Sequence, residues 1–139
     1  MYLRYFLIQS EVIINSMPKI DKSHLNDDEY EITQNCGTEL PFSGEYLDKK
    51  SAGVYHCKVC DNRLFSSDTK YNSGTGWPSF YDKISDSINT KKDSSVNMVR
   101  TEILCSKCDS HLGHLFDDGP KPTGNRYCVN SLSLNFKNE

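Results

Sequence analysis

The cysteines of the chain could do two kinds of chemistry, because their spacing divides them into two groups. Four form two Cys-x-x-Cys pairs and two stand alone. The pairs are Cys57 with Cys60 and Cys105 with Cys108, and the single cysteines are Cys36 and Cys128. Thiolates are zinc ligands, and two such pairs supply four sulfurs for one tetrahedral ion. We therefore expect one structural zinc ion and two thiols left for redox chemistry.

The two pairs lie much further apart than the roughly 15–20 residues that separate the pairs of a zinc ribbon. The site would therefore tie two distant hairpins together. One pair could instead be a thioredoxin-like redox motif, but no βαβ pattern surrounds either pair. His111 and His114 could also act as ligands, although four sulfurs already fill the coordination shell. A closed shell stabilises the fold and leaves no open position for catalysis.

Cys128 lies in the segment Arg126-Tyr127-Cys128-Val129-Asn130. In a strand, Arg126, Cys128 and Asn130 project to one face and the two residues between them project to the core. A neighbouring cation lowers the pKa of a thiol, and the amide could hydrogen-bond beside the sulfur. The alternative is a buried structural cysteine in a terminal strand. The first interpretation predicts a reactive thiol.

Two further segments could complete a site around that thiol. His111 and His114 offer imidazoles for acid–base work, and they face the same way only if a turn or bulge intervenes, which Gly113 permits. Trp77 follows two glycines in the loop 74–78, from which its ring could wall a small apolar pocket. The alternatives are two surface histidines and a tryptophan that anchors the core.

The elements that must position these residues are mostly strands. The sequence predicts a mostly β, antiparallel fold with short helices near the N-terminus, a helix over 27–32 capped by Ser23 or Asn26 and a helical turn over 45–50. Predicted strands cover 54–57, 63–65, 96–104, 111–116, 126–129 and 132–136. Residues 85–95 are polar, and we expect them to be exposed.

Length and charge limit the classes of function. The 139 residues suit one domain, which we place at residues 21–139 after an extension over 1–20. The net charge of −3 argues against a general nucleic-acid binder. No apolar run reaches the roughly 18 residues of a membrane span. Residues 1–8 are apolar without a clear cleavage site, and Met17 could begin the functional domain. Unpaired thiols favour the cytosol, with the mitochondrion second.

Six blocks between residues 25 and 136 closely resemble the B-type methionine sulfoxide reductases. They are Gly-Thr-Glu-Leu-Pro-Phe-Ser-Gly at 37–44, both Cys-x-x-Cys pairs, Ser-Gly-Thr-Gly-Trp-Pro-Ser-Phe at 73–80, His-Leu-Gly-His-Leu-Phe-Asp-Asp-Gly-Pro at 111–120, and Arg-Tyr-Cys-Val-Asn-Ser at 126–131. The resemblance implies two antiparallel sheets and reduction of the R epimer of methionine sulfoxide, as free amino acid or in proteins. From the charge and hydropathy of the chain we expect a protein that binds neither nucleic acid nor membrane, and we expect a monomer.

The resemblance assigns roles to single residues. It makes Cys128 the nucleophile with Arg126 near it. His111, His114 and Asn130 would line the polar side of the site. Trp77 and Phe116 would shape the pocket for the substrate methyl group, and the four paired cysteines would bind the structural zinc.

The implied chemistry leaves Cys128 as a sulfenic acid, which a second thiol converts to a disulfide that a thioredoxin-type protein reduces. Many members of the family carry that second cysteine in the tryptophan loop, where this chain has Thr75. Cys36 is the only other thiol outside the zinc set, so we expect it to be the resolving cysteine. Direct reduction of the sulfenic acid without Cys36 is the alternative.

Two other classes of function remain at this point. A zinc-stabilised module that binds a protein partner would explain the Cys-x-x-Cys pairs, but not the Arg126, Cys128 and Asn130 face or the tryptophan loop. Another thiol enzyme, such as a disulfide reductase, would explain the reactive cysteine. Selectivity for the R over the S sulfoxide would separate that enzyme from the methionine sulfoxide reductases.

Overall fold

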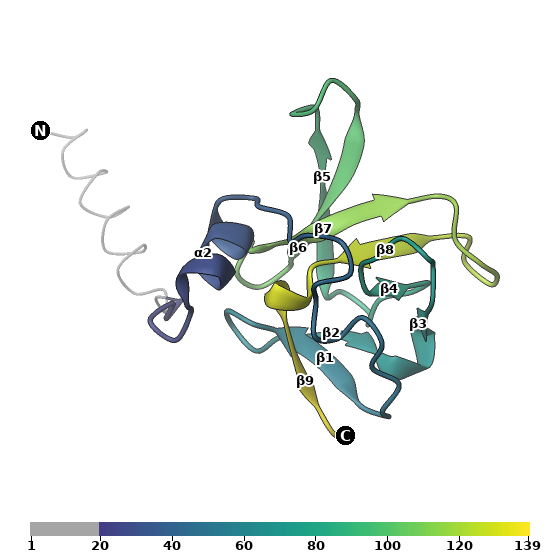
Figure 1. Cartoon of the computed structure of the whole chain (residues 1–139), viewed down its shortest axis with the longest axis horizontal. Coiled ribbons are helices and arrows are strands. Elements are labelled where there is room, and N and C mark those ends of the chain that lie inside the picture. The colour runs from purple at the N-terminus through teal and green to yellow at the C-terminus, as the bar shows by residue number, and fades with distance from the viewer. Residues whose placement is uncertain (1–19) are drawn as a thin grey trace, which may run out of the picture.

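Two antiparallel β-sheets form the body of the protein in the computed structural model, which describes residues 20–139 (Figure 1). The smaller sheet has the strand order β2-β1-β9, and the larger has the order β3-β4-β8-β7-β6-β5. The strands are β1 (Val54–Cys57), β2 (Arg63–Ser66), β3 (Lys70–Tyr71), β4 (Ser79–Phe80), β5 (Ile88–Asp93), β6 (Arg100–Cys105), β7 (His111–Phe116), β8 (Arg126–Val129) and β9 (Leu134–Lys137). The predicted class, mostly β with two antiparallel sheets, is confirmed. The extension and the targeting segment expected before residue 20 lie outside the described residues.

Aromatic side chains join the two sheets. Phe65 of β2 stacks on Phe80 of β4 with ring centroids 4.4 Å apart, and Tyr55 of β1 meets the edge of Phe80 at 5.1 Å. Tyr127 of β8 lies against Phe65 from the larger sheet. Tyr55, Phe65 and Phe80 are fully buried. Burial of rings this large contributes the main part of the core energy, and it holds β8 rigidly by its inward face.

The helix α2 (Asp27–Gln34) begins as the sequence predicts. Asn26 is its N-cap, and Asn26 and Glu29 exchange side-chain to backbone hydrogen bonds in a capping box. Ser23, the other predicted cap, instead hydrogen-bonds Asp21. The helix lies against β7 and the 3₁₀ turn η2 (Ser131–Ser133), and it buries Ile32. It is the only α-helix among residues 20–139.

Three predicted elements differ from the structure. Residues 45–48 form a turn, because so short a segment after Gly44 cannot repay the cost of helix nucleation. The strand expected over 96–104 begins only at Arg100, and Val96 and Val99 are exposed in the connection from β5 to β6. Residues 85–95 are mostly exposed as expected, but they contain β5, an edge strand whose polar side chains face water.

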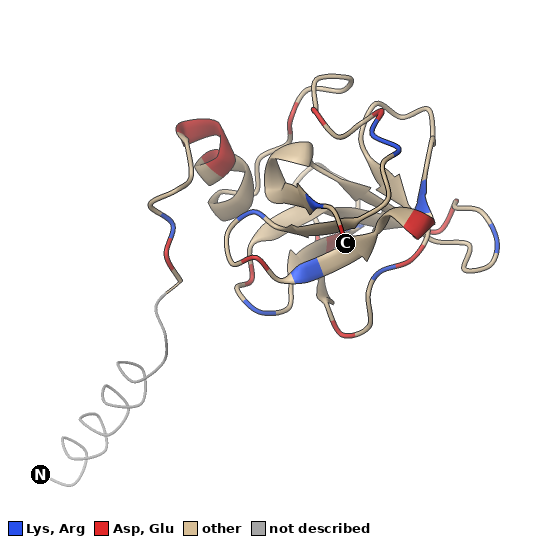
Figure 2. Ribbon diagram, turned by 90° about the horizontal axis from the view of Figure 1, so that it is seen from below, with Lys and Arg blue, Asp and Glu red and all other residues tan. Residues whose placement is uncertain are grey.

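Charge is spread over the surface. Helix α2 carries acidic residues in its first turn, and short basic and acidic stretches are scattered over the rest of the ribbon (Figure 2). No helix within residues 20–139 is both long and apolar enough to cross a membrane.

Candidate active site and metal site

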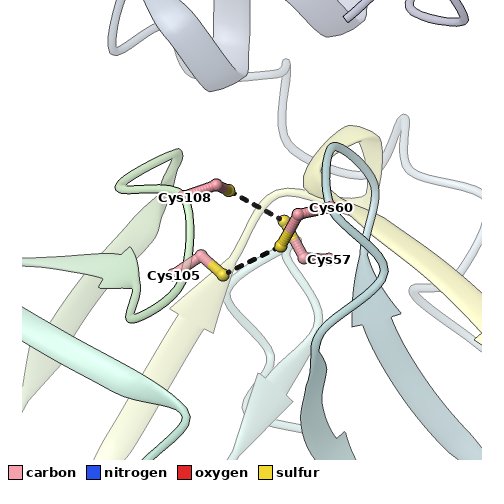
Figure 3. A group of neighbouring side chains, drawn as sticks. All are labelled: Cys57, Cys60, Cys105 and Cys108. Carbon is pink, nitrogen blue, oxygen red and sulfur yellow. Dashed lines mark hydrogen bonds between the residues drawn. The ribbon is translucent and has the colours of Figure 1, made fainter. Parts of the chain in front are cut away.

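The four paired cysteines meet where the two sheets approach each other (Figure 3). Cys57 is the last residue of β1 and Cys105 the last of β6, and Cys60 and Cys108 lie in the turns that follow. The sulfur atoms of Cys57 and Cys108 are 3.7 Å apart, and those of Cys60 and Cys105 are 3.5 Å apart. A tetrahedron of thiolates around zinc has edges of roughly 3.8 Å. The cluster therefore fits a metal ion bound by four thiolates.

The two Cys-x-x-Cys turns have the same backbone geometry. An aspartate follows each pair in the left-handed region, Asp61 with φ of 69° and Asp109 with φ of 59°. The N–H of each aspartate donates to the carbonyl of the first cysteine of its pair at 2.9 Å. Aspartate tolerates this conformation better than most residues. The repeated turn points both sulfurs of each pair inward, so the site joins the β1–β2 hairpin to the β6–β7 hairpin.

Cys128 occupies the middle of the larger sheet. In β8 it is paired with Ser79 of β4 on one side and with His114 of β7 on the other. The strand alternates as predicted: Tyr127 and Val129 are buried, whereas Arg126 and Cys128 are half-buried on the opposite face. Two flanking strands therefore fix the direction in which the thiol points.

A cavity of about 230 Å³ opens beside this thiol. Its walls include six of the residues that the sequence singles out. They are Trp77, His114, Phe116, Arg126, Cys128 and Asn130. Thr38, Thr75 and Arg100 also line it. Cys36 and His111 are not among its lining residues, so the structure separates these two from the group predicted to surround Cys128.

Burial raises the pKa of the Cys128 thiol above its ordinary value. Arg126 and a hydrogen bond with Thr75 act in the opposite direction but do not outweigh it. The sequence suggests that a neighbouring cation would lower this pKa, and the structure shows that burial dominates. Thr75 is held in turn by Ser73, at 2.8 Å between hydroxyl oxygens. A hydroxyl thus contacts the thiol from position 75.

Arg126 is fixed by two partners. Its Nε and Nη2 donate to the two carboxylate oxygens of Asp118 at 2.8 and 3.1 Å. Its guanidinium also lies over the ring of Phe116, 4.2 Å from the centroid. The hydrogen bond from Arg126 holds the pKa of Asp118 below its usual value. Arg126 therefore presents a charge beside Cys128 in one orientation, and Phe116 serves as its platform.

His114 is paired with a carboxylate that the sequence did not indicate. Its Nε2 lies 2.8 Å from Oδ2 of Asp93 in β5, and the same oxygen accepts a hydrogen bond from Arg100 at 3.3 Å. The hydrogen bond with His114 is the main reason that the pKa of Asp93 lies well below its usual range. Asp93 thus orients two side chains that line the cavity.

His111 faces a different carboxylate. A bulge in the β6–β7 pairing, where Leu104 is opposite His111 and Ile103 is opposite Gly113, brings the two imidazole rings to 5.5 Å. A bulge is one of the two irregularities that the spacing of the histidines requires if their rings are to approach each other. Nδ1 of His111 lies 2.6 Å from Oε2 of Glu102, and burial lowers the pKa of the imidazole. Nε2 is buried without a hydrogen-bond partner in the described part of the chain.

Asn130 ties the segment 37–39 to the cavity. Its Oδ1 accepts from the backbone N–H of Glu39 at 3.1 Å, and its Nδ2 donates to the carbonyls of Leu112 and Gly37 at 3.3 and 3.4 Å. These bonds use the amide that could have faced the sulfur. The backbone carbonyl of Glu39 accepts from Nε1 of Trp77 at 3.0 Å. Segment 37–39 therefore positions Trp77 as well.

The loop that carries Trp77 depends on Gly76. Its φ is +95°, and a Cβ there would lie 2.8 Å from the Cβ of Pro41, whereas a Cβ at Gly74, with φ of +76°, would meet nothing within 4 Å. We expect Gly74→Ala to lower the free energy of unfolding by about 1 kcal/mol through backbone strain alone. Gly76→Ala adds a clash, so we expect a loss of about 2–4 kcal/mol. Urea unfolding of both variants measures the difference, and equal losses would contradict the close contact.

Cys36 lies in a second cavity next to the first. Its backbone is left-handed, with φ of 57°, directly after helix α2. This cavity, of about 500 Å³, shares Thr38, Arg100 and His114 with the cavity of Cys128. Sγ of Cys36 lies 3.5 Å from Oε2 of Glu102, and partial burial together with this carboxylate raises the pKa of the thiol. Cys36 is therefore near the site and is held as a thiol.

Sequence reasoning missed the acidic partners of the site. Asp93, Glu102 and Asp118 each bind a cavity or histidine side chain. Asp93 and Glu102 lie in no motif, and the block 111–120 contains Asp118 without assigning it a role. Glu102 lies within the segment 96–104, for which the sequence predicts a strand and no functional role. Alternation in that strand would have placed it on the same face as Arg100, which is the one signal available.

The fold and the cavity together define a thiol enzyme built on a four-cysteine metal site. Comparison with known proteins gives the family. Residues 25–138 match the model of the SelR domain. The chain belongs to this family, that of the B-type peptide methionine sulfoxide reductases, which confirms the resemblance drawn from its motifs.

Curated relatives agree over most of the chain. The peptide methionine sulfoxide reductase MsrB of Hahella chejuensis is 57% identical, covering 86% of this chain and 91% of the relative. The MsrB of Escherichia coli K12 is 58% identical over 83% of this chain and 85% of its own length. The chloroplastic reductase B1 of rice is 56% identical over 84% of this chain, which spans only 55% of that longer protein.

A solved structure shares the fold at low identity. The Yippee-like domain of Mis18 superimposes with a TM-score of 0.52 and 17% identity, covering 64% of this chain and 98% of that domain. At this identity the likeness concerns the arrangement of the strands alone.

Proposed function

We propose that the protein reduces the R epimer of methionine sulfoxide in proteins to methionine, with Cys128 as the nucleophile. The observation that carries the proposal is the position of Cys128 in a cavity walled by Trp77, His114 and Arg126. Relatives named as peptide methionine sulfoxide reductases, at 57–58% identity over most of the chain, support the same reaction. Reduction of methionine sulfoxide makes the protein an oxidoreductase.

In the first step the Cys128 thiolate attacks the sulfoxide sulfur. The sulfoxide oxygen takes up one proton from an acid in the site as the bond between the two sulfur atoms forms. The hydroxyl then passes to the sulfur of Cys128 while the bond between the two sulfurs and the sulfur–oxygen bond of the substrate break, which releases methionine and leaves Cys128 as a sulfenic acid. Arg126 stabilises the thiolate electrostatically against the cost of burial. The rings of Trp77 and Phe116 offer apolar surface for the methyl group of the substrate.

The acid that serves the sulfoxide oxygen is His114 rather than His111. His114 lines the cavity, and its Nε2 lies 2.8 Å from the carboxylate of Asp93, which orients the ring beside Cys128. His111 lies behind it, and burial lowers the pKa of its imidazole, which favours the neutral form. Asn130 acts by holding segment 37–39, and with it Trp77, at the cavity.

In the second step Cys36 attacks the Cys128 sulfenic acid, a disulfide forms, and water leaves. Three observations support Cys36 as the resolving cysteine. The cavity that Cys36 lines adjoins the cavity of Cys128. A hydrogen bond from Asn130 holds Gly37, the residue after Cys36, at the site. Position 75, where many members of the family carry the resolving cysteine, is a threonine in this chain. A thioredoxin-type reductant then restores both thiols.

Loss of Cys36 separates the two steps. We expect Cys36→Ser to form one equivalent of methionine per chain at the wild-type rate, because Cys128 is intact. Turnover with thioredoxin should then fall by about tenfold or more, because the sulfenic acid must be reduced directly. Rapid-quench and steady-state assays measure the two rates. Normal thioredoxin-dependent turnover of Cys36→Ser would favour direct reduction instead.

The reaction itself is tested with stereochemically pure substrates. Peptides that carry the R sulfoxide, the S sulfoxide or the free amino acid sulfoxide are supplied with a chemical dithiol, and methionine is measured. Turnover of the R peptide with no turnover of the S peptide supports the proposal, whereas reduction of disulfides without reduction of sulfoxide would indicate another thiol enzyme.

We propose that the four paired cysteines, Cys57, Cys60, Cys105 and Cys108, bind one zinc ion. Four thiolates at tetrahedral spacing are a typical structural zinc set. Zinc there would hold the two hairpins together and take no part in the redox steps. The protein is further proposed to act as a monomer in a reducing compartment, the cytosol first and the mitochondrion second, without nucleic acid or membrane.

A further inference from the structure

Glu102 lies between the second cysteine and the histidine pair. It projects from β6, and its side chain is only 9% exposed. Its Oε2 lies 3.5 Å from Sγ of Cys36 and 2.6 Å from Nδ1 of His111. The Cys36 thiol donates to this oxygen. In the His111 tautomer that carries its proton on Nδ1, the imidazole donates to the same oxygen, so Oε2 accepts both hydrogen bonds.

The same three residues could also be taken for a metal site, since their ligand atoms lie within 4.8 Å of one another. The distance between Nδ1 and Oε2 argues for a proton instead. Two such ligands on one tetrahedral ion stand roughly 3.3 Å apart, whereas 2.6 Å is a short, charge-assisted hydrogen bond.

We propose that Glu102 is the base that takes the proton of the Cys36 thiol when Cys36 attacks the Cys128 sulfenic acid. The inference rests on the proposed function of Cys36. In this step the S–H bond of Cys36 breaks and its proton passes to Oε2 of Glu102. The sulfur electron pair forms the S–S bond with Cys128, the S–O bond breaks, and the hydroxide takes a proton from solvent to leave as water. Glu102 then returns its proton to solvent through the second cavity.

The structure explains why a base is needed here. The carboxylate and partial burial disfavour a free Cys36 thiolate, which would otherwise attack unaided. Removal of the proton during the attack avoids that charged intermediate. His111 keeps Oε2 in place from the opposite side, and its ring is itself held between Glu102 and His114.

Other charges face this group from the neighbouring elements. Lys91 of β5 is the cross-strand partner of Glu102, and His114 of β7 is its partner on the other side. Lys92, Asp93 and Arg100 line the same cavity as Cys36. Of these, Lys91 acts on the Cys36 thiol in the direction opposite to Glu102.

The test is Glu102→Gln, which keeps the shape of the side chain and removes the base. Stoichiometric R sulfoxide is added to reduced protein without reductant, samples are quenched with an alkylating agent, and the Cys36–Cys128 disulfide is measured by mass spectrometry. We expect disulfide formation to slow by about tenfold or more at neutral pH. We also expect its rate to rise more steeply with pH than in the wild type, because Cys36 must then ionise by itself.

Slower disulfide formation in Glu102→Gln would distinguish a base from a residue that acts only through its charge or its packing. Loss of the negative charge makes the Cys36 thiolate easier to form, so without a base role the disulfide should form faster. Glu45→Gln is the matched control: this carboxylate is exposed in the turn over 45–48 and lines neither cavity, so its removal should change neither rate. Glu102→Asp keeps a carboxylate and should recover part of the rate.

Each outcome separates this inference from the function on which it rests. If the wild type makes methionine but no disulfide, the resolving role of Cys36 fails and the role of Glu102 fails with it. Equal rates and pH profiles in the wild type and Glu102→Gln would overturn the base role alone. Should Glu102→Gln not fold, Glu102→Asp decides, because it keeps a carboxylate but draws it back from Sγ of Cys36, and an unchanged rate of disulfide formation in that variant would overturn the base role.

Discussion

Cys128→Ser is expected to abolish the reduction of methionine sulfoxide, by at least about a thousandfold, the order of loss that follows removal of a nucleophile. A serine hydroxyl stays protonated near neutral pH and forms no sulfenic acid. The size change is small, and Cys128 is held between β4 and β7, so the fold should survive. Methionine formed per chain in a single turnover is the measurement.

The protonation of Cys128 gives the same prediction a second readout. Burial raises the pKa of this thiol, and only the deprotonated form is nucleophilic. Alkylation of Cys128, followed in a Cys36→Ser background, should therefore keep rising with pH where an ordinary thiol has levelled off. Residual single-turnover activity in Cys128→Ser, or alkylation that levels off near neutrality, would contradict Cys128 as a buried attacking thiol.

Loss of the metal is expected to have the largest effect on stability. Cys105 is fully buried, and Nδ2 of Asn62 donates to its sulfur at 3.6 Å. A serine hydroxyl at this position would be out of reach of water, so its burial would add to the cost of losing the metal ligand. Structural zinc binding is worth about 10–16 kcal/mol in small peptides, comparable with the whole stability of a domain of about 5–15 kcal/mol. Cys105→Ser, or extraction by a strong chelator, should therefore cost several kcal/mol and leave the two hairpins untied.

Metal analysis and thermal unfolding measure this effect together. The wild type should contain one equivalent of zinc, and Cys105→Ser should contain far less and unfold at a much lower temperature. Cys36→Ser is the control, because it also removes one thiol but lies outside the cluster. A Cys105→Ser protein that unfolds at the wild-type temperature would show that the cluster does not hold the fold.

Local patterns in the chain predicted most of the strands, because alternation and β-branched or aromatic residues act over a few positions. Strands 54–57, 111–116 and 126–129 begin and end where the sequence predicts. The strand over 96–104 starts four residues late because Val96 and Val99, although apolar, lie in a hairpin connection without a core to cover them. β5 was missed because an edge strand needs no apolar alternation.

The sequence by itself determined the cysteines and their division, since Cys-x-x-Cys spacing is a local geometry, and it placed Arg126 and Cys128 on one face. Only the tertiary structure decided what surrounds them. Asp93 and Glu102 come from strands β5 and β6, and they meet His114 and His111 across the ladders. The pKa of a thiol also depends on every group packed around it, and those groups come from all parts of the fold. For Cys128 burial outweighs the neighbouring cation, and no short motif could have indicated that balance.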